Sequence, residues 1–286
     1  MKKVCILLLI LLSENIYPQE RTDSLLNLLD SHTGEARIEV LGELCWENRF
    51  SHPEDALKYG LEALKLVNQF ESSTYEAKIH NFLGIIQRNV GNHAMALEYF
   101  FKARRIAREQ ENQEDLAYAY NNIGDIYNLE GSYGEALRYE LQALQIFEEI
   151  GDSLGVSYCC HQIALAYSNL YEFTSALAYH RRAMNIRTSS GNRAGIAYSL
   201  ISIGQNYLSL ENHTEALRCL EQSLEIFKDL DHNFGLSLSY YNLGLYYKKT
   251  GQTEEAIHFF TTSLNLGKKT GSQIDVRNAA QELSEI

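Results

Sequence analysis

Apolar residues recur along the chain with a period of 40 residues. Six copies of the pattern are in register, at 41–80, 81–120, 121–160, 161–200, 201–240 and 241–280. One column of small residues consists of Ala56, Ala96, Ala136, Ala176, Ala216 and Ala256. A second column, aromatic in five copies, consists of Tyr59, Tyr99, Tyr139, Tyr179, Cys219 and Phe259. A fixed period of this length is typical of an array of stacked repeats.

Within each copy the apolar residues form two stripes with helical spacing. In the third copy, Ile123, Gly124 and Tyr127 share the first stripe, and Ala136, Tyr139 and Ala143 share the second. Glycines follow the first stripe (Gly91, Gly131, Gly251) and the second (Gly151, Gly191, Gly271). Because glycine marks turns, we expect each copy to be a helix A, a tight turn and a helix B. The small residues of the columns predict that the two helices approach closely.

This pattern resembles the tetratricopeptide repeat, in which Leu-Gly, two residues and Tyr precede Ala, an aromatic residue and a second Ala. Leu243-Gly244-x-x-Tyr247, Ala256, Phe259 and Ser263 reproduce it, with Ser in place of the second Ala. The family's usual repeat has about 34 residues, and its proline after helix B is absent here. Since proline stops a helix, its absence fits longer helices. HEAT and armadillo repeats have a similar period but lack this pattern. The resemblance implies an all-α fold, a right-handed superhelical solenoid of antiparallel helix pairs.

The ends of the chain differ from the repeats. Lys2 and Lys3 precede nine apolar residues, the layout of a secretory signal peptide and too short to span a bilayer. We therefore expect residues 1–19 to be a signal peptide and the protein to be exported, to the periplasm; the alternative is a short buried helix. Residues 20–40 are expected to hold an N-terminal capping helix, at Thr22 to Ser31, and the start of the first helix A. Residues 41–280 are the six repeat units.

Residues 281–286 are predicted to belong to a truncated seventh unit, since Asp275 to Ile286 fit the pattern of a helix A. A terminal repeat needs a polar outer face, whereas this one presents Leu283 and Ile286. We expect either that the natural protein continues or that a partner covers this end, for example in a homodimer. Contact with a membrane is expected only through such a C-terminal region.

The net charge and the lack of catalytic motifs exclude several classes of function. The net charge of −12 and the pI of about 5.2 argue against nucleic-acid partners and anionic membrane surfaces. The sequence lacks a Gly-rich phosphate loop, His-Glu-x-x-His and Gly-x-Ser-x-Gly, so we predict no catalytic residues and no cofactor. Cys159, Cys160 and His161 are contiguous, and successive helical residues point about 100° apart. They cannot converge on one ion, so no metal site is predicted.

The resemblance implies that helix A of each repeat lines the concave surface, the surface with which solenoids bind their partners. Asn and Gln, which both donate and accept hydrogen bonds, gather there, followed by the cations Lys248 and Lys249 near the C-terminal end. In the family an Asn just before Leu-Gly holds the ligand main chain; Asn122 and Asn242 match it, whereas Phe82 and Ser202 do not. The alternative is an ordinary solvated polar face. The predicted peptide-binding groove comprises Asn81, Arg88, Asn121, Asn122, Asp125, Asn128, His161, Gln162, Asn169, Gln205, Tyr241 and Asn242.

We therefore predict a non-catalytic scaffold that binds a protein or an extended peptide in this groove. The alternative is the exported sensory region of a larger signal-transduction protein, a histidine kinase or a transcriptional regulator, whose output domain is absent from this chain. The chain is similar to the exported repeat regions of such bacterial proteins, which open with a short Asp-Ser-Leu-Leu helix, here Asp23 to Leu26.

Overall fold

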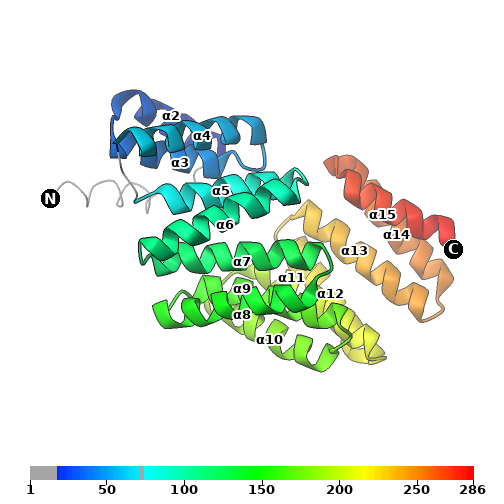
Figure 1. The fold of residues 1–286 in the computed structure, drawn as a ribbon. Helices are drawn as coiled ribbons and strands as arrows, with labels where there is room; N and C mark the ends of the chain where they lie inside the picture. Colours follow the sequence, from blue (N-terminus) through cyan, green and yellow to red (C-terminus); the bar gives the residue numbers. More distant parts are fainter. Residues whose placement is uncertain (1–17, 71–73) are drawn as a thin grey trace. The chain divides into compact units, whose positions relative to one another are not determined.

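The structure is a computed structural model that describes residues 18–70 and 74–286 (Figure 1). These residues form α-helices joined by short turns and contain no strand, which confirms the predicted all-α class. The expected signal peptide lies outside the described residues, except that Pro18 and Gln19 begin the first described helix, α2. No helix of the described residues is long and apolar enough to cross a membrane.

The chain divides into two compact units, residues 1–126 and 127–286. The first contains α2 (Pro18–Ser31), α3 (Glu35–Glu47), α4 (Pro53–Phe70), α5 (Glu76–Asn89), α6 (His93–Glu109) and most of α7 (Gln113–Leu129). The second begins within the last turn of α7 and continues with α8 (Tyr133–Ile150), α9 (Ser153–Asn169), α10 (Phe173–Ser189), α11 (Arg193–Ser209), α12 (His213–Asp229), α13 (Asn233–Lys249), α14 (Thr253–Thr270) and α15 (Gln273–Glu285).

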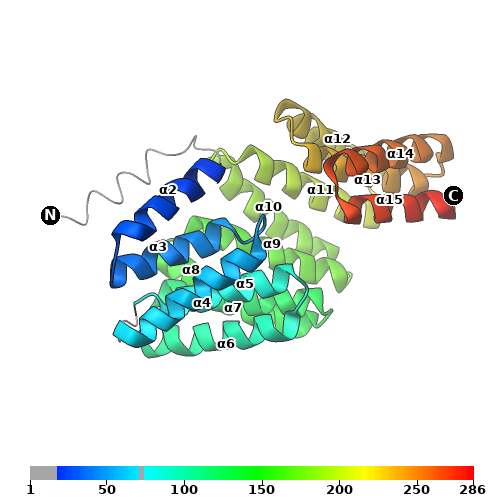
Figure 2. The same ribbon diagram turned by 90° about the horizontal axis from the view of Figure 1, so that it is seen from above.

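Within each unit the helices form hairpins that stack on one another. α3 packs on α4 and α5 on α6 in the first unit; α9 packs on α10, α11 on α12 and α13 on α14 in the second. The first helix of a hairpin also packs on the second helix of the preceding hairpin, as α11 does on α10 and α15 on α14 (Figure 2). This is the stacking of a helical-repeat solenoid. Helix A of the copy at 121–160 begins at Gln113, so this hairpin starts eight residues before its 40-residue frame, as do those that begin with α9, α11 and α13.

Close packing of the helices depends on the small residues of the pattern. All six alanines of the Ala56 column are completely buried. A Cβ atom on Gly244 would lie 2.6 Å from the ring of Phe260, and one on Gly84 would lie 2.4 Å from the ring of Phe100. The two helices of a repeat therefore pack as closely as the small residues of the sequence predict. The column of Phe100 and Phe260 continues with Glu140, His180 and Leu220, so two polar side chains occupy core positions, both with no exposed surface.

From α5 onward, each tight turn between helices contains a residue in the left-handed region of φ. Between helices A and B this residue is Gly91, Gly131 or Gly251, as the pattern predicts, with φ of 82°, 76° and 77°. Tyr171 and Glu211 take the same position with φ of 63° and 59°. After Glu211 the N–H of Asn212 donates to the carbonyl of Tyr207 over 2.9 Å, the long bond of a Schellman motif. Spacing therefore imposes the turn even where the residue is not glycine.

Candidate peptide-binding face

We call the side of the A helices that carries the predicted groove residues the helix-A face. In the first unit it comprises Asn81 and Arg88 on α5 and Asn121, Asn122 and Asp125 on α7. In the second unit it comprises Asn128, His161, Gln162, Asn169, Gln205, Tyr241 and Asn242, from the end of α7 and from α9, α11 and α13. The two parts are described separately.

In the first unit the face is tied together by side chains that join α5 to α7. Arg88 forms an ion pair with Asp125. The side-chain amide of Asn81 donates to the backbone carbonyl of Asp115 over 3.2 Å. These residues therefore hold the two helices in register, whatever else they contact.

Two amide atoms of the first unit are buried without a protein partner. They are Oδ1 of Asn81 and Nδ2 of Asn122, on side chains of residues that are 3% and 6% exposed. Buried polar atoms without a partner are uncommon, because burial removes their hydrogen bonds to water. Asn122 matches the clamp position of the family, and its burial means that a ligand reaches it only if neighbouring side chains move.

The second unit repeats the same arrangement of bonds from one A helix to the next. The amide of Asn128 donates to the carbonyl of Gln162 over 3.1 Å, and the amide of Gln205 donates to Oδ1 of Asn242 over 2.6 Å. Between these two pairs, the hydroxyl of Ser168 donates to Oδ1 of Asn206 over 2.9 Å. The sequence analysis missed Asn206, because it lies one position beyond the column of Gln205 and reads as a core position.

Two further predicted residues of the second unit bond or pack within their own hairpin. The amide of Asn169 donates to the carbonyl of Leu165 in the same helix over 2.9 Å. The ring of His161 lies 5.4 Å from the ring of His180, which belongs to α10. Burial lowers the pKa of His161 to about 4 and that of His180 to about 3, so both rings are neutral near pH 7.

A depression of about 480 Å³ lies on the helix-A face between α11, α13 and α15, with Leu220 of α12 also in its lining. Leu208, Leu220 and Leu245 form its apolar part, and Gln205 and Asn242 contribute amides. The charged side chains of Lys248, Lys249, Glu282 and Glu285 complete the lining. Its volume falls in the range of ligand pockets in proteins, about 300–1,000 Å³. This is where predicted groove residues and a concave surface coincide.

Lys248 and Lys249, the two cations expected near the C-terminal end of the array, both interact with other groups of the protein. Nζ of Lys248 lies 2.7 Å from a carboxylate oxygen of Glu282 and 3.0 Å from one of Glu285. Lys249 donates to the backbone carbonyl of Leu208 over 2.9 Å. Glu282, which also accepts a bond of 3.4 Å from the hydroxyl of Tyr241, was missed because the sequence analysis treated 281–286 as an incomplete repeat.

The cysteines of the described residues, Cys45, Cys159, Cys160 and Cys219, are buried free thiols. Burial raises the pKa of the Cys45 thiol to about 12 and that of Cys160 to about 11. Thiols with raised pKa values are poor nucleophiles and poor metal ligands near pH 7. Within residues 21–70 and 74–286, no group of three or more His, Cys, Asp and Glu side chains is arranged to hold a metal ion.

The fold is similar to several solved structures. The apo form of RapI shares 16% sequence identity, with a TM-score of 0.69 over 86% of this chain and 88% of that one. A Rap protein complexed with Competence and Sporulation Factor shares 15%, with a TM-score of 0.67 over 94% and 84%. NprR in complex with its cognate peptide NprX shares 18%, with a TM-score of 0.67 over 93% and 78%. At these identities the likeness concerns the fold alone.

No curated protein sequence matches the chain. A family model described as "Tetratricopeptide repeat" matches residues 75–149, 157–229 and 209–269. These matches cover more than half of the 286 residues. The protein therefore belongs to the tetratricopeptide repeat family.

Proposed function

We propose that the protein is a non-catalytic scaffold that binds an extended peptide or a protein segment on its helix-A face. The observation that carries the proposal is the depression between α11, α13 and α15, which combines a leucine lining with amide groups. Membership of a family that binds through such surfaces supports it. So does the similarity in fold to a Rap protein and to NprR, whose structures were solved with Competence and Sporulation Factor and with the peptide NprX.

Gln205 gives this site its recognition chemistry. It is exposed, and its bond to Asn242 uses one N–H of the amide. The second N–H and the carbonyl oxygen can pair with the alternating acceptors and donors of an extended main chain. Leucines beside it can bury an apolar side chain of the same peptide. The site thus favours an extended segment with an apolar residue.

The test is a random peptide library selected against residues 18–286, followed by titration of a recovered peptide against two variants. Gln205→Trp fills the depression, whereas Gln145→Trp changes an exposed glutamine of a B helix, on α8. We expect Gln205→Trp to weaken binding about tenfold or more, which corresponds to about 1.4 kcal/mol, and Gln145→Trp to leave it unchanged. Equal affinity of both variants, or no peptide recovered, contradicts the proposal.

We also propose, from the sequence alone, that residues 1–19 direct export. The test is N-terminal sequencing of the protein from a periplasmic fraction. A new N-terminus near residue 20 is expected, and an intact Met1 on protein found only in the cytosol contradicts export.

A further inference from the structure

In three repeats of the second unit an aromatic ring of helix B covers the tyrosine of its helix A. Tyr139 stacks on Tyr127, with ring centroids 5.6 Å apart, and Tyr179 stacks on Tyr167 at 5.8 Å. Phe259 stacks on Tyr247 at 5.2 Å. In the fifth repeat the same column holds Cys219, whose side chain is too small to cover the corresponding Tyr207. The repeat therefore lacks a ring where its neighbours have one.

A pocket of about 560 Å³ lies at this place, between α10, α11 and α12. Its lining is mainly apolar, and Cys219 and Tyr207 form part of its wall. It is formed by the B helices α10 and α12 over α11, and it shares no lining residue with the depression on the helix-A face. Its apolar lining consists of Met184, Ile196, Leu200, Ile203 and Ile226.

A second local change keeps the pocket open. One repeat earlier, Glu148 on α8 and Arg182 on α10 form an ion pair that links the two B helices. Forty residues further, the corresponding positions hold Thr188 and Gln222. Both are exposed and line the pocket, and their side chains cannot form an ion pair. Neither a ring nor a charged bridge therefore closes the groove between α10 and α12.

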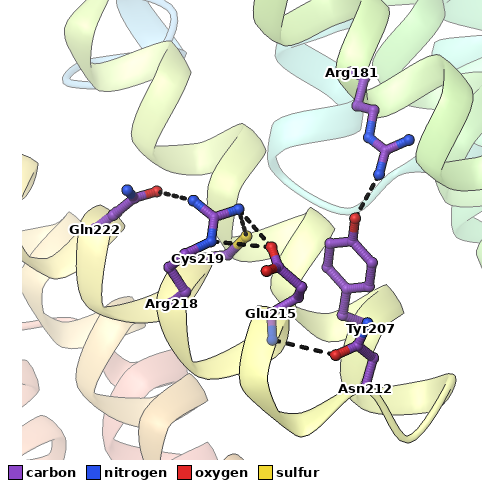
Figure 3. A network of polar contacts seen from close by, with 7 residues as sticks. All are labelled: Arg181, Tyr207, Asn212, Glu215, Arg218, Cys219 and Gln222. Carbon is purple, nitrogen blue, oxygen red and sulfur yellow. Dashed lines mark hydrogen bonds and ion pairs between the residues drawn. The ribbon is translucent and has the colours of Figure 1, made fainter.

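Beside Tyr207 the rim of the pocket carries the cations Arg181 and Arg218, whereas the carboxylates Glu225 and Asp229 line it further along α12. Figure 3 shows that Arg181 from α10 points to the hydroxyl of Tyr207, to which it donates a hydrogen bond. In the part of the chain that the structure describes, no carboxylate pairs with Arg181. Arg218, on the other side, is bound to Glu215 at 2.6 Å and to Gln222 at 3.1 Å. Arg181 is thus the cation of this rim that has no anionic partner.

We propose that this pocket is a second docking site, which receives an aromatic side chain of a partner polypeptide with a neighbouring Asp or Glu. The ring takes the place that Tyr179 and Phe259 take in their own repeats and stacks on Tyr207, an arrangement that aromatic pairs favour. Its edges contact the aliphatic lining. The neighbouring carboxylate accepts hydrogen bonds from the guanidinium of Arg181, the group best suited to it. The site is independent of the one proposed on the helix-A face.

The first test uses 3-phenylpropionate, which joins an aromatic ring to a carboxylate, as a probe in methyl NMR. We expect saturable shifts at the methyl groups of Ile196, Ile203, Ile226 and Met184. The uncharged 3-phenylpropionamide should bind about threefold more weakly, as for loss of an exposed ion pair, and 3-cyclohexylpropionate should bind more weakly because it cannot stack. Shifts centred on Leu245 of the helix-A face, or equal binding of the acid and the amide, overturn the proposal.

The second test closes the pocket in two independent ways. Cys219→Tyr restores the missing ring, and the surface pair Thr188→Glu with Gln222→Arg restores the bridge seen between α8 and α10. Both variants should retain the melting transition and lose the shifts, whereas Gln205→Trp should keep them. If the folded surface double variant binds the probe as the original protein does, the proposal is wrong, even where Cys219→Tyr fails to fold.

A third measurement identifies the occupant. A peptide with Phe-Asp flanked by glycines should bind more tightly than 3-phenylpropionate, and the same peptide with Leu in place of Phe should not. Sedimentation equilibrium should show no self-association that depends on Cys219. An association that Cys219→Tyr abolishes assigns the pocket to a second copy of this chain and overturns the proposed partner.

Discussion

The amide of Gln205 donates to the side-chain oxygen of Asn242 over 2.6 Å and so joins α11 to α13. Asn242, only 2% exposed, also donates to the carbonyl of Leu238 over 2.8 Å. The amides of the helix-A face therefore have a structural role, because their hydrogen bonds fix the spacing of successive A helices. Any ligand of this face therefore contacts side-chain amides that already form hydrogen bonds within the protein.

Truncation of Asn242 should accordingly reduce stability. Asn242→Ala removes both of these hydrogen bonds, the one from Gln205 and the one to Leu238, so we expect a loss of about 1–3 kcal/mol in the free energy of unfolding. Urea denaturation followed by circular dichroism measures it. The control is Asn169→Ala, because Asn169 is exposed and bonds within its own helix; its effect should stay within about 0.5 kcal/mol. Equal losses in both variants would mean that the bridge contributes nothing.

Glu211 offers a prediction about the turns. Its φ of 59° is unfavourable for a residue with a Cβ atom by roughly 1–2 kcal/mol. Glu211→Gly relieves this but gains freedom in the unfolded chain, so a net stabilisation of about 0.5–1 kcal/mol is expected. Glu211→Ala keeps the Cβ atom and should change little. Thermal unfolding of the two variants side by side distinguishes them, and a less stable glycine variant would refute the account of the turn.

His180 should make the protein sensitive to acid. Its two ring nitrogens are buried without partners, and burial lowers the pKa from its ordinary value of 6.5 to about 3. Below pH 6.5 the unfolded chain binds a proton that the folded ring does not accept until about pH 3, so stability falls as the pH drops through this window. His161 and His80, with pKa values lowered by burial to about 4, act in the same direction.

His180→Leu copies the residue that the fifth repeat has at this position, Leu220. The variant should unfold at a higher urea concentration at pH 7, since it removes two buried ring nitrogens that have no hydrogen-bond partner. Its stability should also decline less steeply between pH 6.5 and pH 4. A pH profile parallel to that of the original protein would contradict the assignment of this sensitivity to His180.

Asp115 should have the opposite dependence on pH. Burial raises the pKa of this carboxyl to about 6, so between pH 3.8 and 6 the folded state holds a proton that the unfolded state has lost. Stability therefore falls as the pH rises through this range. Asp115→Asn retains an acceptor for the Asn112 amide, which lies 2.7 Å away, and should stabilise the protein at pH 7 by about 1–2 kcal/mol. Exposed Glu114 provides the control, as Glu114→Gln should have little effect.

Sequence periodicity predicted the repeat, the helix pairs and the small residues between them, because a fixed column has the same neighbours in every copy. It could not predict which polar residues bond to one another. The bridge from Gln205 to Asn242 depends on the distance between two helices, and Asn206, one residue away, is buried instead.

The pocket at Cys219 did have a signal in the sequence, the interruption of an aromatic column. The interruption can be interpreted as a pocket only because the structure shows that the aromatic residue of this column stacks on the tyrosine of helix A, as in Tyr167–Tyr179 and Tyr247–Phe259. The polar core residues Glu140 and His180 were missed for a related reason. Their column also contains Phe100 and Phe260, whose rings pack against Gly84 and Gly244 of helix A. These contacts, which the sequence does not show, identify the column as a set of core positions.

Photo-crosslinking tests the central claim, binding on the helix-A face, most directly. The photoreactive residue p-benzoylphenylalanine is placed at Gln205 in one variant and at Gln145 in another, and each is irradiated with a peptide selected against the original protein. The account predicts a crosslink from position 205 that excess unlabelled peptide suppresses, and none from position 145. A crosslink from position 145 with none from 205 would contradict it.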